Sequence, residues 1–298
     1  MDKKRLFALF LSLSFLPTFI CVLFLYFYTD SIFNNRNNKS NKSKDLKIAT
    51  TTTIKINNDT DKKDSGKNIN NINNKGNIST NIRSKVAIVI DDLGIEYPKT
   101  KDFLESNIKL TFAIIPDTPI ADKIYEYCIN KGLTIILHLP MEANFKKVED
   151  NAIFIRMGDE EIINRLNYFF EKYNSIIGAN NHMGSRATQD KRVMNLILTN
   201  IKNRDLIWLD SVTSSNKTTK GIAKDLQIKY LERDVFLDNE KDFKYIKKQM
   251  EYLISIAKKK GSAIGIGHVS SGNLLSVLRE YYKKESELGI EFVYLNEL

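Results

Sequence analysis

Histidine and carboxylate residues stand at the ends of the apolar runs that predict strands. The stretch VAIVIDDLG places five apolar residues directly before Asp91 and Asp92. The chain has three histidines, and His138, His182 and His268 each fall at such a strand end. Two adjacent carboxylates repel each other, and this repulsion is relieved if one binds a cation and the other faces a water molecule. Histidine and carboxylate from separate strands are the usual ligands of a catalytic zinc or similar divalent ion, so we predict such a metal site with one position open for water.

Each of these residues also has a structural explanation when it is taken alone. Asp91 and Asp92 could cap the helix or turn that follows them. His138, in LHLPME, could be a core histidine bonded to a neighbouring carbonyl. Arg233 and Asp234, in ERDVFLD, could form a structural ion pair. The metal hypothesis therefore depends on the joint pattern and not on any single residue.

Further polar residues stand at the same predicted strand ends. Asn180 and Asn181 precede His182 in NNHMGS, where they either serve a tight turn or orient a ligand histidine from outside the metal site. Asp210 follows the apolar run LIWL. We expect Asn181 and Asp210 to contact the residues of the site.

The elements that must position these residues alternate in type from residue 85 to the end of the chain. Apolar runs are separated by amphipathic, helix-like segments, and this alternation predicts parallel βαβ units with helices covering the sheet. The predicted strands are VAIVI (86–90), LTFAII (110–115), LTIILHL (133–139), SIIGA (175–179), LIWL (206–209), QIKYL (227–231), AIGIG (263–267) and EFVYL (291–295). In such folds the functional groups gather at the carboxyl ends of the strands. Seven or eight strands in a region of this length favour a closed or nearly closed (β/α) barrel over an open sheet.

A different composition precedes this domain. Residues 6–28 carry no charge and are long enough as a helix to span a bilayer, so we predict that residues 1–28 form a membrane anchor. Lys3, Lys4 and Arg5 favour a cytoplasmic N-terminus with the rest of the chain exported. The segment is not followed by a small-x-small cleavage site, so we expect that it is not removed. We therefore expect a membrane-anchored protein whose folded domain lies outside the cytoplasm, in a periplasm or at the cell exterior.

The Asn- and Lys-rich residues 29–84 contain few large apolar side chains, so we predict a disordered linker. Of the 45 basic and 36 acidic residues of the chain, 15 and 6 fall in residues 1–85, which leaves 30 of each sign from residue 86 onward. The folded domain is therefore neutral overall, and a nucleic-acid partner is not expected. The basic linker either lies against anionic headgroups or envelope polymers, or is solvated without a partner.

Six segments together resemble a known family. IDDLG, LHLPME, GANNHMGS, WLDS, ERDVFLD and AIGIGHV, in this order, resemble the divergent polysaccharide deacetylases, a branch of the NodB-like carbohydrate deacetylases. The resemblance covers residues 85–298. It implies a (β/α) barrel of about seven parallel strands and a divalent metal, usually zinc, bound by one aspartate and two histidines. The implied reaction is hydrolysis of an N- or O-acetyl group on a cell-envelope polysaccharide or peptidoglycan.

The resemblance also implies roles for single residues. Asp91 corresponds to the general base, Asp92 to a metal ligand and His138 to the first metal-binding histidine. His268 corresponds to the late histidine that protonates the leaving amine or hydroxyl. His182 is assigned as the third ligand, as is typical of the divergent branch.

The sequence departs from the ordinary deacetylases in two places. Where they have their second metal histidine, four residues after the first, this chain has Glu142. The Arg-Pro-Pro-Tyr stretch whose arginine orients the base is also missing. Arg186 and Arg233 are the candidates to replace that arginine.

The predicted function is a membrane-tethered, metal-dependent carbohydrate deacetylase. The alternative is a non-catalytic envelope-binding or assembly factor that keeps the barrel. A metal-dependent phosphoesterase is less favoured, because such enzymes use more carboxylate and asparagine ligands and often two ions.

Overall fold

The computed structural model describes residues 83–298. The predicted membrane anchor and nearly all of the predicted linker lie outside the described residues, so both stay predictions. No helix within residues 83–298 combines the length and the apolar character needed to cross a bilayer.

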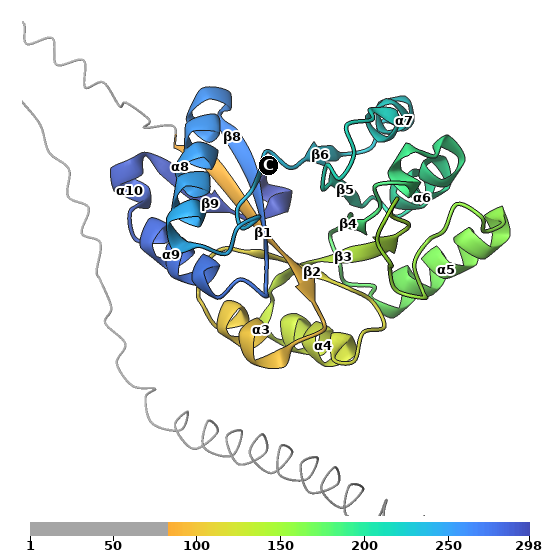
Figure 1. Ribbon diagram of the computed structural model, residues 1–298, viewed down its shortest axis with the longest axis horizontal. Helices are drawn as coiled ribbons and strands as arrows, with labels where there is room; N and C mark the ends of the chain where they lie inside the picture. The colour runs from red at the N-terminus through yellow and green to blue at the C-terminus, as the bar shows by residue number, and fades with distance from the viewer. Residues whose placement is uncertain (1–82) are drawn as a thin grey trace, which may run out of the picture. The chain divides into compact units, whose positions relative to one another are not determined.

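The described residues form one parallel sheet with helices along its outer side (Figure 1). The strands are β1 (Ser84–Leu93), β2 (Thr111–Ile114), β3 (Thr134–Met141), β4 (Gly178–Met183), β5 (Ile207–Asp210), β6 (Tyr230–Glu232), β7 (Val235–Phe236), β8 (Ser262–His268) and β9 (Ile290–Val293). The helices are α3 (Tyr97–Leu104), α4 (Ala121–Lys131), α5 (Asp159–Lys172), α6 (Lys191–Asn203), α7 (Thr218–Leu226), α8 (Phe243–Lys260), α9 (Gly272–Tyr282) and α10 (Glu285–Leu288), with 3-10 turns η2 (Ala187–Gln189) and η3 (Leu295–Glu297). The predicted alternation of parallel strands and helices is confirmed.

The sheet is curled but its hydrogen-bonded order does not return on itself. The order is β6-β5-β4-β3-β2-β1-β8-β7, with β9 beside the first half of β1. The end strands β6 and β7 are consecutive parts of one extended segment. Within that segment the Arg233 N–H donates to Asp210 O on the β5 side, and the Asp234 N–H donates to Ile264 O on the β8 side. The prediction of a closed or nearly closed barrel of about seven strands is confirmed in part: the parallel sheet is curled, but it has nine strands and its two ends are joined only by the chain.

Two apolar layers follow from the alternation of side chains along the strands. Val86, Ile88 and Ile90 belong to the large core between the sheet and the helices. Ala87 and Val89 belong to a smaller core inside the curl. Both layers are fully buried at these positions, which explains why β1 is a continuous apolar run rather than an alternating one.

Small residues in β8 allow two helices to approach the sheet closely. A Cβ added at Gly265 would lie 2.7 Å from Leu253 of α8, and one added at Gly267 would lie 2.4 Å from Leu274 of α9. Leucine side chains of α8 and α9 thus fill the space that Gly265 and Gly267 leave open. β8 ends at His268, whose register partner in β1 is Asp91.

Candidate metal centre

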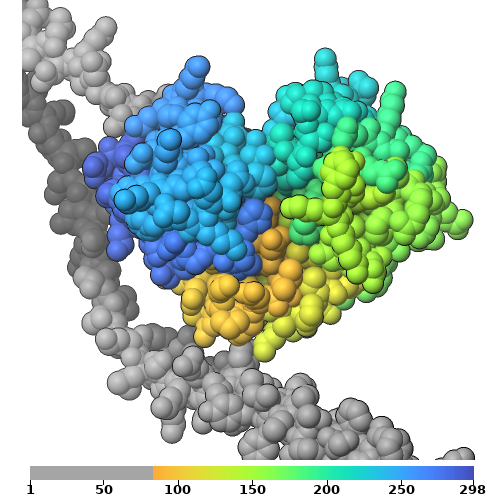
Figure 2. Space-filling view, in the orientation of Figure 1, coloured from red at the N-terminus to blue at the C-terminus, as the bar shows by residue number. Residues whose placement is uncertain are grey.

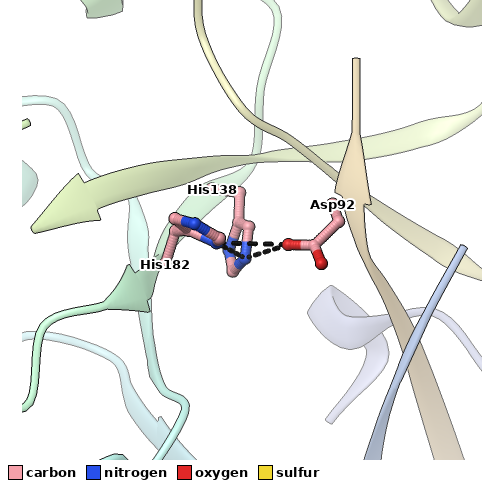
Figure 3. A group of neighbouring side chains, drawn as sticks. All are labelled: Asp92, His138 and His182. Carbon is pink, nitrogen blue, oxygen red and sulfur yellow. Dashed lines mark hydrogen bonds and ion pairs between the residues drawn. The ribbon is translucent and has the colours of Figure 1, made fainter. Parts of the chain in front are cut away.

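Three predicted ligands converge at the ends of three strands. Asp92 is carried by β1, His138 by β3 and His182 by β4, and their side chains point toward one another (Figure 3). Asp92 Oδ1 lies 3.3 Å from His138 Nε2 and 3.1 Å from His182 Nδ1. The two histidine nitrogens are 3.0 Å apart. This is the one group in residues 83–298 whose ligand atoms lie close enough to hold a metal ion.

An irregularity in β1 explains how two adjacent aspartates serve one site. In a regular strand neighbouring side chains point to opposite faces. The pairing of β1 with β2 shifts register between Ile90 and Leu93, as in a β-bulge, and Asp92 adopts the left-handed conformation with φ 65°. This backbone turn lets the carboxylates of Asp91 and Asp92 both lie beside His138 Nε2. Neither aspartate caps α3, whose N-cap is Glu96 with no side-chain cap.

The donor set fits a divalent ion. Tetrahedral bonds of about 2.0 Å place ligand atoms about 3.3 Å apart, close to the separations found among these three residues. Asp92 Oδ1 is buried and makes no hydrogen bond of acceptable geometry, which leaves its lone pairs to a cation. Nearby histidines outweigh the effect of burial and lower the pKa of Asp92, so it is ionised at neutral pH.

Outer partners leave the correct nitrogen free on each histidine. His138 Nδ1 lies 2.8 Å from Asn180 Oδ1, and an amide oxygen only accepts, so this nitrogen carries the proton and Nε2 faces the site. His182 Nε2 lies 3.4 Å from Glu149 Oε1, which leaves Nδ1 toward the site. The predicted alternative for His138, a bond to a carbonyl of the core, is thus replaced by a contact with a side-chain amide.

Asp91 is buried beside the three ligands. Its Oδ1 accepts a hydrogen bond of 3.0 Å from Asn180 Nδ2, and its Oδ2 lies 3.6 Å from His138 Nε2. Burial raises the pKa of Asp91, and the charges of His138 and His268 offset this only in part. A carboxylate whose pKa is raised holds a proton more readily, as a general base requires.

His268 faces this group from β8. The ring nitrogen Nδ1 lies 2.9 Å from Asp238 Oδ1, and the backbone N–H donates to Asp238 Oδ2 at 2.8 Å. Burial lowers the pKa of His268, but the hydrogen bond and charge of Asp238 outweigh it and raise the pKa to about 9. The ring also stacks on Phe236, with centroids 5.5 Å apart, and Arg233 Cζ lies 3.7 Å from the Phe236 centroid.

Asn181 and Asp210, which were predicted to contact the residues of the site, bond to loops and strands beside it. Asn181 joins neighbouring loops instead of contacting a ligand histidine: its Nδ2 donates to Met183 O, and its Oδ1 accepts from the Ser211 N–H. Asp210 accepts from the Val212 N–H at 2.7 Å and from the hydroxyl of Tyr230.

The two arginines proposed to orient the base, Arg186 and Arg233, have different partners. Arg186 is half exposed and pairs with Glu142 at 2.7 Å. Arg233 donates to the backbone oxygen of Ser211, and the Ser211 hydroxyl accepts from the same Asn180 Nδ2 that donates to Asp91 Oδ1. Arg233 is therefore the candidate that is connected to the base. Its predicted ion pair with Asp234 is not formed, because Asp234 pairs with Lys260 at 2.6 Å.

Three residues around the site were missed or underrated by the sequence: Asn180, Glu149 and Asp238. Asn180 pairs in register with His138 across β3 and β4, so alternation along a longer β4 places Asn180 and His182 on one face. Asp238 follows the two-residue strand β7, which was not predicted. Glu149 lies in the loop after β3, and no sequence pattern marks it as part of the site.

The fold and the site define a parallel α/β protein with a candidate metal centre at its strand ends. A family model for divergent polysaccharide deacetylases matches residues 88–298, and the chain belongs to this family. This confirms the resemblance found in the sequence.

The related proteins have no assigned function in their names. An uncharacterized protein of Haemophilus influenzae is 34% identical over 198 residues, which are 66% of this chain and 70% of that protein. The uncharacterized protein YibQ of Escherichia coli K12 is 31% identical over 188 residues, 63% of this chain and 59% of YibQ, so the match spans less than two thirds of YibQ. The crystal structure of an uncharacterized Agrobacterium tumefaciens C58 protein has a TM-score of 0.67 at 21% identity over 72% of this chain and 89% of that chain, which is a likeness of fold.

Proposed function

We propose that this chain is a metal-dependent hydrolase that removes acetyl groups from a carbohydrate polymer of the cell envelope. The convergence of Asp92, His138 and His182 beside the buried Asp91, in a member of the divergent polysaccharide deacetylase family, is the observation that carries the proposal. One carboxylate and two imidazoles suit zinc better than magnesium or calcium, which prefer oxygen ligands.

When bound, the ion would polarise the carbonyl of the acetyl group and lower the pKa of a water molecule. The chain itself moves the protons. Because Asn180 occupies Asp91 Oδ1, the other carboxylate oxygen, Oδ2, is the atom that takes the proton of the attacking water. The same Asn180 side chain orients His138, so base and ligand are held by one amide.

His268 supplies the proton for the leaving group. Its Nδ1 is held by Asp238, which leaves Nε2 to donate to the departing sugar nitrogen or oxygen. A pKa of about 9 keeps the ring protonated at neutral pH, as a general acid must be.

We place this activity outside the cytoplasm, next to the membrane. The uncharged residues 6–28 and the long polar linker support this location, since a tether of this kind holds a domain near an envelope polymer.

The test is elemental analysis of the full chain, purified in detergent, beside the triple variant Asp92→Ala/His138→Ala/His182→Ala. We expect about one equivalent of zinc or another divalent ion in the wild type, none in the folded variant, and acetate release from acetylated envelope sugars by the wild type only. A wild type that takes up no ion even from excess would contradict the proposal and favour the envelope-binding alternative.

A further inference from the structure

Helix α8 carries a row of exposed side chains along its outer face. Lys244, Lys248, Tyr252 and Lys259 are separated by four, four and seven residues, so they share one face of the helix, and we call this row the α8 stripe. The opposite face of α8 is buried against β8 and β1. Figure 2 shows α8 at the surface of the molecule, to the left of the hollow between the C-terminal elements and those of residues 134–226. The α8 stripe therefore points away from the sheet.

The charge of α8 differs from that of the domain as a whole. Within Phe243–Lys260 there are six lysines and one acidic residue, whereas the region from residue 86 onward has 30 basic and 30 acidic residues. Lys244, Lys248 and Lys259 form no ion pair with any residue of 83–298. The positive charge of the α8 stripe is therefore not balanced by a contact within the described part of the chain.

Acidic side chains in α8, at its N-cap and in the facing helix α9 are already engaged with other groups. They are Asp242, which accepts from the Lys244 and Tyr245 N–H groups; Glu251, which accepts from the Tyr281 hydroxyl at 3.0 Å; and Glu280, which pairs with Lys247 and Lys284 at 2.9 Å each. These contacts reduce the charge around the α8 stripe but do not remove it, because none of them uses a lysine ammonium group of the stripe.

The α8 stripe ends where the N-terminal part of the chain enters the domain. The Lys85 N–H donates to Gly261 O at 2.9 Å, and Gly261 is the C-cap of α8. The predicted linker, residues 29–84, would have an end-to-end distance of about 40 Å as a flexible chain. A domain tethered this close to a bilayer meets it at an effective concentration on the order of millimolar, at which weak contacts are populated.

We propose that the α8 stripe binds anionic lipid headgroups and holds the domain against the membrane. Lysine ammonium groups reach lipid phosphates, and the Tyr252 ring, which is 57% exposed, suits the level of the headgroups. The metal centre lies at the strand ends and α8 covers the outer side of the sheet, so this contact leaves the centre uncovered (Figure 1). For the same reason the α8 stripe fits a membrane better than a polymer that is bound at the centre. The inference uses the membrane location in the proposed function and goes beyond its chemistry.

The test measures energy transfer from a fluorescent donor on the full chain to a headgroup-labelled lipid in nanodiscs. Ser255→Cys places the donor on the outer face of α8, and Asn203→Cys, at the exposed end of α6, is the matched control position. Both are made with Cys21→Ser. Cys128 stays unlabelled because it is buried and burial raises the pKa of its thiol to about 12. We expect transfer from position 255 to exceed that from position 203 in discs with phosphatidylglycerol, and the two to converge in phosphatidylcholine alone.

Removing two charges from the α8 stripe measures its contribution. A lysine near an anionic surface strengthens binding about fivefold, so Lys248→Gln/Lys259→Gln lowers the ratio of docked to undocked domains by about 25-fold. Lys248→Arg/Lys259→Arg keeps the docked state because the charge remains. Lys191→Gln/Lys202→Gln, which removes two exposed lysines of α6, is the matched control and leaves the ratio unchanged.

Equal transfer from both positions in anionic discs, or an unaffected Lys248→Gln/Lys259→Gln protein, overturns the inference. So does a loss of affinity for a soluble acidic polysaccharide without a loss of transfer, because the α8 stripe then serves an acidic polymer. Acetate release from soluble acetylated oligomers is measured on the same proteins and does not depend on the stripe. Docking without acetate release contradicts the proposed chemistry alone, and acetate release without docking contradicts this inference alone.

Discussion

The two sides of the site use histidine in opposite ways. On the side of β1, β3 and β4, His138 and His182 aim nitrogens at one carboxylate oxygen, at separations that suit a shared ion. On the β8 side, His268 is held by Asp238 at 2.9 Å and its pKa is raised to about 9. The outer partner of His138 is an amide, which orients the ring without adding charge, whereas the partner of His268 is a carboxylate, which retains the proton. His182 also faces a carboxylate, Glu149, but at 3.4 Å, and its other nitrogen lies beside Asp92, so the difference between ligand and acid lies in both neighbours of each ring.

Removing the carboxylate that both ligand histidines face has the largest expected effect. We expect Asp92→Ala to lose the bound ion and to reduce acetate release to background, since two imidazoles alone hold a divalent ion weakly. Metal content and acetate release measure this. Asp225→Ala, at an exposed aspartate on α7, is the control. An Asp92→Ala protein with full metal content would show that the ion binds elsewhere.

Changing the other side separates the acid from the ligands. We expect His268→Ala to lower kcat by about 10²- to 10⁴-fold, the usual contribution of a general acid, while the metal content stays at the wild-type value. If the metal content falls with kcat, then His268 is a ligand and the contrast between the two sides is wrong.

A smaller effect is expected from the amide that orients both Asp91 and His138. Asn180→Ala removes the acceptor of His138 Nδ1 and the donor to Asp91 Oδ1, so the ring can turn and the base loses its support. We expect metal affinity to fall by about 10- to 100-fold, measured by competition with a chelating dye. Asn203→Ala, at the exposed end of α6, serves as the control, and unchanged affinity would mean that packing alone holds His138.

The sequence predicts the ligand types because strand ends converge in a parallel α/β fold, and this needs only the order of the strands. It does not predict which of two neighbours faces inward. The predicted fourth strand stopped at residue 179, but β4 continues to Met183, so Asn180 lies within it and pairs with His138. Asp92 reaches the site through a positive φ that nothing in Asp-Asp-Leu-Gly requires.

The sequence predicts a closed or nearly closed sheet, but it does not show how the two ends of the sheet meet. β6 and β7 have three and two residues, and each pairs on one side only. Strands of this length carry no detectable period. Missing β7 also hid Asp238, which comes two residues after that strand and holds His268.

The smallest expected effect concerns folding stability and is measured on the metal-free protein. The pKa of His268 is about 9 in the folded state, above the ordinary value of 6.5, because of the hydrogen bond and charge of Asp238. A raised folded-state pKa means that this contact stabilises the protein fully below pH 6.5, and that the stabilisation is lost as pH rises through 9.

Asp238→Asn should therefore lower the melting temperature most below pH 6.5, and the difference from the wild type should shrink by pH 9 and above. Asparagine keeps the size and one acceptor of the side chain but removes its charge, so the pH dependence isolates the electrostatic part of the contact. Thermal unfolding in chelator between pH 6 and pH 10 measures it. A constant difference across this range would mean that Asp238 acts through its hydrogen bonds alone, and His268 would then lose the feature that sets it apart from His138.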